Sequence, residues 1–336
     1  MEPVLVTGAA GFIGYHLAAR LIAAGRPVIG VDNLNAYYDP ALKRARLAQL
    51  AARPGFSFVE ADIADRSAMT RLFAEAGSRT IVHLAAQAGV RHGIGHPHDY
   101  ADANLVGFLN VLEGARAVHA RHLVFASTSS VYGLTPDQPF GEGQETDHPA
   151  SLYAATKKAN EMMAHSYAHL FALPVTGLRF FTVYGPWGRP DMAIYSFTRA
   201  AFEGRTVDLY NHGQQKRDFT YVDDIVSGIT GVIDRPPAPD PAYDAGQPHP
   251  ARSSAPYRLF NIGNNRPETL ATLVALIEKH TGKPLDTRLI PAQPGDVVET
   301  YANIDALSAV AGYRPTTTLD EGIGRFVAWY RGYHHV

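Results

Sequence analysis

Short apolar runs alternate with amphipathic stretches through the first half of this chain. The runs are rich in valine, isoleucine and phenylalanine and have the length of single strands, whereas the stretches between them repeat apolar residues every three or four positions. Strands separated by helices in this way predict an α/β fold, Rossmann-type, with a doubly wound and mostly parallel sheet. The predicted strands are residues 4–7, 28–31, 56–61, 80–84, 122–126 and 175–181.

The regular alternation of strands and helices ends at about residue 178. We therefore expect two domains, residues 1–178 and a smaller C-terminal α/β domain of residues 179–336 that binds the substrate. The segment of about residues 219–235 is expected to pack back on the first domain. Residues 236–256 are dense in Pro, Ala, Asp and Ser and predict a long surface loop. Helices are expected over residues 100–117 and 267–281, among others.

A glycine-rich turn joins the first predicted strand to the first predicted helix. Gly8 would allow a tight turn, Gly11 the close approach of a pyrophosphate, and Gly14 the contact between helix and strand. The free N–H groups of the helix N-terminus then face the phosphates. Asp32 ends the second strand, where its carboxylate can accept hydrogen bonds from the adenosine ribose and repel a 2′-phosphate. The pattern predicts a dinucleotide site that favours NAD over NADP.

Residues that follow two further strands extend this predicted cofactor site. Asp62 lies beyond the carboxyl end of the third strand, where ligands collect in parallel sheets. An adenine contact there is about as well supported as a solvated strand end or a helix cap. Ala85 and Ala86 follow the fourth strand and are small enough to let a cofactor lie against the backbone.

Composition excludes several classes of partner. The formal net charge of −2 over 336 residues gives no general attraction to nucleic acid or to an anionic membrane. Zero cysteines exclude disulfides, thiolate metal sites and a cysteine nucleophile. His92, His96 and His98 lack a spaced set of acidic partners, so no metal is expected. No apolar run is long enough to span a bilayer, and the first strand begins at Val4, so we expect a cytoplasmic protein without a signal peptide.

Tyr153 and Lys157 stand one helical turn apart at the start of a predicted helix. A hydride-transfer site needs a group that removes the hydroxyl proton as hydride leaves carbon. A tyrosine can do so if its pKa, about 10 in isolation, is brought towards neutrality. The Lys157 ammonium and a nicotinamide cation would favour the phenolate. The spacing alone also fits a surface helix, but the pair follows a strand that ends at Thr128, whose hydroxyl can reach the reacting oxygen.

The chain resembles the extended short-chain dehydrogenases/reductases, the NAD-dependent epimerase/dehydratase superfamily, and within it the UDP-glucuronate 4-epimerases. The resemblance covers nearly the whole chain, and its most specific run is residues 178–191. The other matching stretches are residues 7–14, 32–35, 37–38, 128–133, 152–160, 210–213, 216–224 and 293–296.

The resemblance implies a role for each site residue. The catalytic positions are matched by Thr128, Tyr153 and Lys157. The NAD-binding residues are expected to be Gly8, Gly11, Phe12, Ile13, Gly14, Asp32, Asn33, Asp62, Ile63, Leu84, Ala85, Ala86, Tyr153 and Lys157. The substrate-binding residues are expected to be Ser129, Ser130, Thr182, Arg189, Tyr210, Arg217 and Asp296. Among them, Arg217 matches an arginine that grips the UDP diphosphate, for which a planar fork is suited, and Asp296 a uridine-ribose contact.

The reaction implied by this resemblance oxidises C4 of UDP-glucuronate, turns the 4-keto sugar over and reduces its other face to give UDP-galacturonate. NAD is regenerated in each turnover and should stay bound. The keto intermediate is a β-keto acid, which loses CO₂ when its carboxylate bond aligns with the carbonyl π system. We hypothesise that the hydroxyls of Ser129, Ser130 and Thr182, with Arg189 nearby, hold the carboxylate out of that alignment.

Three other enzyme functions and one non-enzymatic function compete with this interpretation. A UDP-glucose/galactose 4-epimerase is the main alternative, although that family has asparagine at the position of Thr182 and arginine at that of Gln293. A UDP-glucuronate decarboxylase typically has glutamate at the position of Ser130, and a dehydratase needs an acid pair at residues 129–130. A dinucleotide-sensing binding protein usually lacks the Tyr/Lys pair. Loop residues 93–96 and 141–145 depart from the resemblance, and a homodimer through the helices of residues 100–117 and 152–170 is expected from it.

Overall fold

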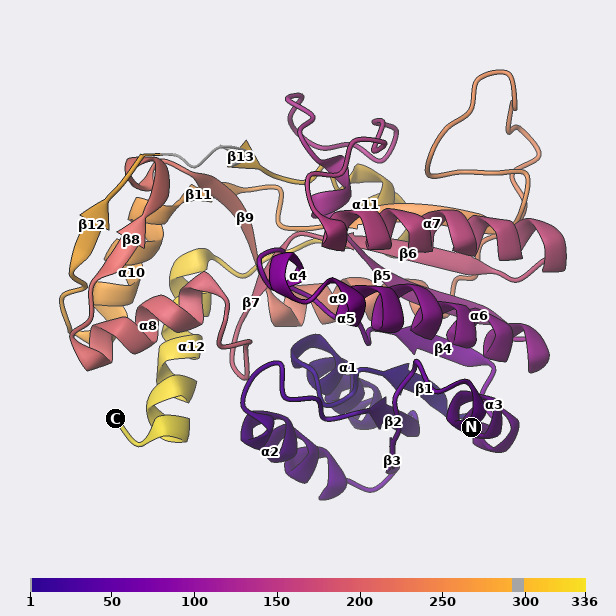
Figure 1. Cartoon of the computed structure of the whole chain (residues 1–336), viewed down its shortest axis with the longest axis horizontal. Helices are drawn as coiled ribbons and strands as arrows, with labels where there is room; N and C mark the ends of the chain where they lie inside the picture. The colour runs from indigo at the N-terminus through magenta and orange to yellow at the C-terminus, as the bar shows by residue number, and fades with distance from the viewer. Residues whose placement is uncertain (1, 292–298) are drawn as a thin grey trace.

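The structure is a computed structural model that describes residues 2–291 and 299–336. Within these residues, the larger sheet has seven strands in the order β10-β6-β5-β4-β1-β2-β3, and each neighbouring pair is parallel (Figure 1). The strands are β1 Val4–Thr7, β2 Val28–Asp32, β3 Phe56–Glu60, β4 Thr80–His83, β5 His122–Thr128, β6 Val175–Phe180 and β10 Tyr257–Ile262. The predicted α/β fold with a doubly wound parallel sheet is confirmed.

Both faces of the larger sheet are covered by helices, because successive strand residues point to opposite faces. In β1, Val4 and Val6 belong to one apolar cluster and Leu5 to another. Leu17 of α1 and Ile229 of α9 pack into the first cluster, whereas α3, α6 and α7 fill the second. The helices are α1 Phe12–Ala23, α2 Pro40–Ala51, α3 Arg66–Ala76, α6 Gly107–Ala117, α7 Leu152–Phe171 and α9 Val222–Ile233.

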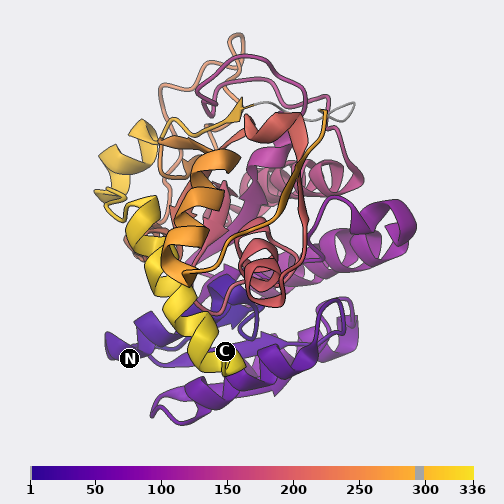
Figure 2. The same ribbon diagram turned by 90° about the vertical axis from the view of Figure 1, so that its left-hand side faces the viewer.

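A smaller α/β part follows and lies beside the first (Figure 1), and Figure 2 views the molecule from the side of this smaller part. Among the described residues its strands are β7 Thr182–Tyr184, β9 Lys216–Tyr221, β11 Pro267–Thr269 and β13 Glu299–Thr300, with β8 Val207–Leu209 paired separately to β12 Thr287–Leu289. Its helices are α8 Ala193–Glu203, α10 Leu270–Thr281 and α12 Leu319–His334, whereas α11 Asp305–Ala311 packs against α9 and β10 of the larger part. In Figure 2 the yellow α12 runs from this part towards the N-terminal helices.

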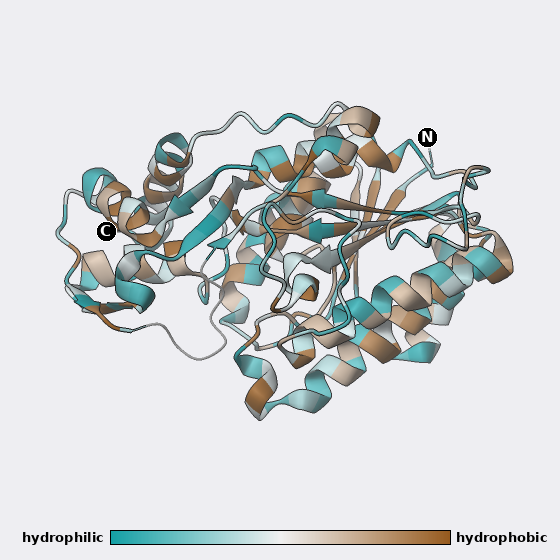
Figure 3. Cartoon of the chain, turned by 90° about the horizontal axis from the view of Figure 1, so that it is seen from above, coloured by the Kyte–Doolittle hydropathy of each residue, from teal (hydrophilic) through white to brown (hydrophobic). Residues whose placement is uncertain are grey.

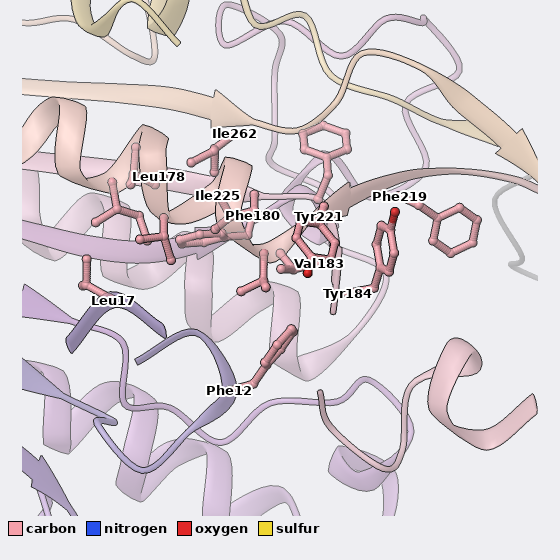
Figure 4. Close-up of a cluster of buried hydrophobic side chains, with 14 of the residues drawn as sticks. Phe12, Leu17, Leu178, Phe180, Val183, Tyr184, Phe219, Tyr221, Ile225 and Ile262 are labelled. Carbon is pink, nitrogen blue, oxygen red and sulfur yellow. The ribbon is translucent and has the colours of Figure 1, made fainter. Parts of the chain in front are cut away.

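The two parts share a hydrophobic core. Apolar residues fill the centre of the molecule, and polar residues lie on the outer faces of the helices (Figure 3). Figure 4 shows Phe12 of α1, Phe180 of β6 and Tyr184 of β7 in one buried cluster with Phe219 and Tyr221 of β9. Since this cluster contains residues of both sheets, the smaller part packs directly against the cofactor-binding turn of the larger one.

Two expected helices have different bounds in the structure. The helix expected over residues 100–117 is helical throughout, but it begins earlier, with α5 Pro97–Tyr100, and it includes the π-helical segment Ala101–Val106 before α6. The helix expected from residue 267 begins only at Leu270, because Pro267–Thr269 pair with β9 and the Thr269 hydroxyl caps α10.

The chain returns to the larger part after residue 178. Helix α9 packs against α1, and β10 pairs with β6 at the edge of the larger sheet. The sequence did not indicate the return of β10, and the domain boundary near residue 178 stays a prediction. No helix within the described residues is both long and apolar enough to cross a membrane.

A buried neutral histidine makes the stability of this fold depend on pH. His83 ends β4 with its Nδ1 2.8 Å from the Thr7 hydroxyl, and burial lowers its pKa to about 3. Since the unfolded histidine has a pKa of about 6.5, only the unfolded state gains a proton as the pH falls below that value. We expect His83 to cost about 2 kcal/mol of stability between about pH 7 and pH 5.

Urea unfolding of wild type and His83→Asn at both pH values measures this contribution. The variant should lose less stability on acidification, by about 2 kcal/mol, whatever its stability at neutral pH. The exposed His98→Asn variant should show the same pH dependence as wild type. Equal pH dependence for His83→Asn and wild type would contradict the assignment.

Candidate active site

The turn between β1 and α1 is packed so closely that side chains cannot replace its glycines. Gly8 has φ +72°, and a Cβ there would lie 2.7 Å from the backbone nitrogen of Ala85. A Cβ at Gly14 would lie 2.0 Å from the carbonyl oxygen of Gly8. The turn thus presses against the first turn of α1, where backbone N–H groups lack intrahelical acceptors. This cradle fits the diphosphate of a dinucleotide.

Backbone N–H groups orient the acid at the end of β2. The two carboxylate oxygens of Asp32 accept hydrogen bonds from Ala10 N at 3.1 Å and from Leu34 N at 2.9 Å. The Nζ of Lys43 lies 3.9 Å from the same carboxylate. At the end of β3, Asp62 accepts a hydrogen bond of 2.9 Å from the Asn33 side chain. The two acids therefore lie on neighbouring strand ends, beside the glycine turn.

Two cavities contain the predicted site residues that the structure describes. The first, of about 640 Å³, is lined by every predicted catalytic and cofactor residue and by four of the predicted substrate residues, Ser129, Ser130, Thr182 and Arg189. The second, of about 360 Å³, is lined by Tyr210 and Arg217. The residues that line both cavities are Arg91, Thr182, Val183, Asp191 and Met192. The predicted uridine contact Asp296 lies outside the described residues. Within the described chain, no group of three or more His, Cys, Asp or Glu side chains could hold a metal ion.

Helix α7 presents Tyr153 and Lys157 to the first cavity. The Ser151 hydroxyl begins the helix by accepting a hydrogen bond of 3.1 Å from Ala154 N. Burial lowers the pKa of Lys157 to about 8, against the opposing charge of Glu161. Burial raises the pKa of Tyr153, whereas the Arg189 guanidinium and a hydrogen bond with Thr128 lower it. The end of β5 and the start of α7 thus meet where Thr128 hydrogen-bonds the Tyr153 phenol.

Arg189 is a cation that acts on Tyr153, which the sequence analysis did not foresee. Its Nε and Nη2 donate to the two carboxylate oxygens of Asp191 at 3.1 and 2.5 Å, and its guanidinium lies 5.8 Å from the centre of the Tyr37 ring. The Tyr37 hydroxyl donates to Asp191 at 3.2 Å. The pKa of Tyr37 is raised to about 12, mainly by burial and secondly by the charge of Asp191. Tyr37 and Asp191 therefore join the site although they were not predicted as site residues.

Arg91 connects the two cavities. Its guanidinium lies 5.4 Å from the ring centre of Tyr210, which opens the 3₁₀ turn Tyr210–Gly213. In the second cavity, Nη1 of Arg217 donates to the carbonyl oxygen of Lys216 at 2.8 Å. Arg91 was not among the predicted site residues, and it lies just before residues 93–96, where the sequence departs from the resembled family.

A buried ion pair between β6 and α7 supports the end of β5. Arg179 of β6 donates from Nε and Nη2 to the two oxygens of Glu161 on α7, both at 2.8 Å. The Ser127 hydroxyl, next to Thr128, donates to the same carboxylate at 2.6 Å. These bonds join β5, β6 and α7 directly behind the catalytic groups.

Replacing Asp32 by alanine tests the cofactor assignment. We expect the affinity for NAD to fall about 10- to 100-fold, since two ribose hydroxyls lose a charged acceptor. The affinity for NADP should rise relative to NAD, because Lys43 remains beside the 2′ position without its neighbouring carboxylate. Calorimetric titration of cofactor-free protein with both dinucleotides gives the ratio. Asp65→Ala, at the N-cap of α3, is the control, and an unchanged NADP/NAD ratio in Asp32→Ala would refute the assignment.

Comparison with known proteins shows which family has this site. A model of the NAD dependent epimerase/dehydratase family matches residues 4–246. A Rhizobium meliloti protein named probable UDP-glucuronate 4-epimerase is 48% identical over 332 residues, which cover 97% of this chain and 96% of that protein. UDP-glucuronate 4-epimerase 1 of Arabidopsis thaliana is 47% identical over 98% of this chain and 77% of its own length.

Solved structures agree with these matches. The UDP-glucuronic acid 4-epimerase of Bacillus cereus, in complex with UDP-glucuronic acid and NAD, has a TM-score of 0.87 and 29% identity. The match covers 98% of this chain and 99% of that chain. The resemblance found in the sequence is confirmed.

Proposed function

Because this chain belongs to the NAD dependent epimerase/dehydratase family, we propose that it is an isomerase that interconverts UDP-glucuronate and UDP-galacturonate. The observation that carries this proposal is the first cavity, where the glycine turn, Tyr153 and Arg189 face one space. When bound there, NAD supplies the acceptor and later the donor of the C4 hydride. The NAD requirement predicted from the glycine turn and Asp32 is confirmed by the family match.

Tyr153 is the group that takes and returns the proton of the 4-hydroxyl. The Thr128 hydroxyl, which hydrogen-bonds the phenol, orients it towards the sugar oxygen. The Arg189 cation favours the phenolate and partly offsets the desolvation that raises the pKa of Tyr153. We assign the same effect to Lys157, one helical turn along α7. As C4 loses hydride, its hydroxyl proton passes to the Tyr153 oxygen and a C4 ketone forms. The same proton is returned after the sugar has turned over.

The intermediate must keep its carboxylate while it turns. The residues Ser129, Ser130 and Thr182 line the first cavity, and Thr182, which begins β7, also lines the second. Arg189 supplies the charge that pairs with a carboxylate. We assign these four residues to holding the carboxylate plane away from the C4 carbonyl.

The second cavity takes the UDP group. It is lined by Arg91, Tyr210 and Arg217, two cations and an aromatic ring suited to a diphosphate and a base. The uridine end fixes the nucleotide, and the sugar beyond the diphosphate is free to rotate about its bonds. This arrangement explains how both faces of C4 can be presented to one cofactor.

The exposed apolar residues of two helices support a homodimer. Met162, Leu170 and Phe171 on α7 and Val106 before α6 are exposed, and large apolar side chains gathered on adjacent helices are typical of an interface. We place the homodimer interface on these helices. The cytoplasmic location stays a prediction from composition.

Incubation of the purified protein with UDP-glucuronate tests the function. We expect UDP-galacturonate as the product, without added NAD because the cofactor is retained. Tyr153→Phe should keep NAD and lower turnover by about 10²- to 10⁴-fold, the usual contribution of a general base. Tyr167→Phe, about four turns further along the same helix and hydrogen-bonded to Glu113, should retain activity. UDP-xylose as the wild-type product, or substantial epimerisation by Tyr153→Phe, would contradict the proposal.

Loss of one carboxylate contact tests how decarboxylation is avoided. Thr182→Ala should convert part of the UDP-glucuronate to a UDP-pentose, because the 4-keto acid gains freedom to align its carboxylate bond. Chromatography of the nucleotide sugars gives the ratio of pentose to UDP-galacturonate. Thr230→Ala, on the outer part of α9, is the control. An unchanged ratio with no pentose in Thr182→Ala would remove Thr182 from this role.

A further inference from the structure

Arg46 is a fully buried arginine whose hydrogen bonds go to carbonyl and hydroxyl oxygens. It lies on α2 with 0% relative exposure. Its Nε and Nη2 donate to the carbonyl oxygen of Trp187 at 3.1 and 2.6 Å, and Nη2 also reaches that of Gly188 at 3.4 Å. Its Nη1 donates to the carbonyl oxygen of Ala10 at 2.9 Å and to the Tyr38 hydroxyl at 2.7 Å.

These acceptors belong to segments far apart in the sequence. Ala10 lies in the glycine turn, and its own N–H donates to Asp32. Trp187 lies two residues before Arg189. A chain of hydrogen bonds therefore runs from the acid at the ribose position, through Ala10 and Arg46, to the segment that carries the cation facing Tyr153.

The Arg189-bearing segment depends on this contact for its shape. Trp187 has φ +62°, in the left-handed region that bulky side chains rarely adopt. Arg46 holds the carbonyl of this residue with two donors. The ring of Trp187 packs against Tyr15 of α1 and Trp329 of α12, at centroid distances of 5.7 and 5.3 Å.

His16 of α1 makes a further hydrogen bond to the same segment. Its Nε2 lies 2.8 Å from the carbonyl oxygen of Pro186, and burial lowers its pKa, so the neutral ring donates this bond. Helices α1 and α2, which flank the cofactor turn, thus both donate hydrogen bonds to carbonyl oxygens just before Arg189.

We propose that Arg46 is a positioning residue that couples the cofactor turn to the Arg189 segment, with His16 as its partner. The assignment of Arg189 to the sugar carboxylate rests on the proposed function, whereas the link to the cofactor turn does not. Within the described residues, the hydrogen bonds of the Arg46 guanidinium go to neutral oxygens, one of them in the turn that receives the diphosphate. Arg46 therefore contributes to dinucleotide affinity through Ala10 and to carboxylate recognition through Trp187.

Arg46→Lys separates these effects from simple loss of charge. Lysine keeps the charge but lacks the planar fork needed to serve carbonyls on two sides. We expect the affinity for NAD and the affinity of the NAD-loaded protein for UDP-glucuronate each to fall about tenfold, while the affinity for UDP is unchanged. During turnover a UDP-pentose should form. Calorimetry gives the affinities, and Arg53→Lys, just beyond the end of α2, is the matched control.

A loss of affinity for UDP-glucuronate without a loss for UDP distinguishes a positioning role from a general structural role. A general structural role would weaken the binding of UDP as well. If Arg46→Lys does not fold, His16→Gln, which replaces the imidazole bound to the Pro186 carbonyl, serves in its place. Its affinities for UDP and UDP-glucuronate are compared in the same way. Unchanged affinities for NAD and UDP-glucuronate in either folded variant, or equal losses for UDP and UDP-glucuronate, would overturn the proposal. If the proposed function is wrong, the wild-type protein will form no UDP-galacturonate. In that case the NAD affinity of Arg46→Lys still tests the coupling between Arg46 and the cofactor turn.

Discussion

The contact between Gly14 and the Gly8 carbonyl is the constraint on which the rest of this structure depends. A Cβ at Gly14 would lie 2.0 Å from that oxygen, so only glycine lets α1 approach the end of β1. The approach sets the N-terminus of α1 over the sheet edge and orients Ala10, whose N–H holds Asp32 and whose carbonyl accepts from Arg46. The position of the cofactor, and through Arg46 the position of the Arg189 segment, follows from this one contact.

The parallel sheet makes a single edge available for the chemistry. Strand ends that are far apart in the sequence meet there, so Asp32, Asp62 and Thr128 face one cavity. The smaller part closes this edge with the segment from β7 to Arg189, which the shared core around Phe12 and Phe180 holds in place. Under the proposed function, this edge holds the cofactor, and the second cavity is the one proposed to fix the nucleotide while the sugar turns.

Sequence reasoning predicted the parts of this site that have a local signature. The strand–turn–helix pattern around Gly8, the acid at Asp32 and the i, i+4 pair of Tyr153 and Lys157 are all visible within short windows. The roles of these residues remain predictions until they are measured, but the structure places them in one cavity.

The remaining features depend on contacts between distant residues, which no local pattern reports. Arg46 meets Trp187 across 141 positions, and Tyr37 meets Asp191 across 154. Similarly, the return of β10 to the larger sheet depends on pairing with β6, and its sequence reads only as a strand. The early part of the helix expected at residue 267 was wrong because cross-strand pairing with β9 outweighed helical periodicity.

The central claim is that one hydride leaves C4, stays with the captive cofactor and returns to the same carbon. UDP-glucuronate that carries deuterium at C4 tests this most directly in ordinary water. The account predicts that the UDP-galacturonate formed, and the UDP-glucuronate recovered, both keep the deuterium at C4. Replacement of that deuterium by solvent hydrogen would contradict it. The C4 hydrogen would then have been removed as a proton by a base, where it exchanges with water, and not transferred as hydride.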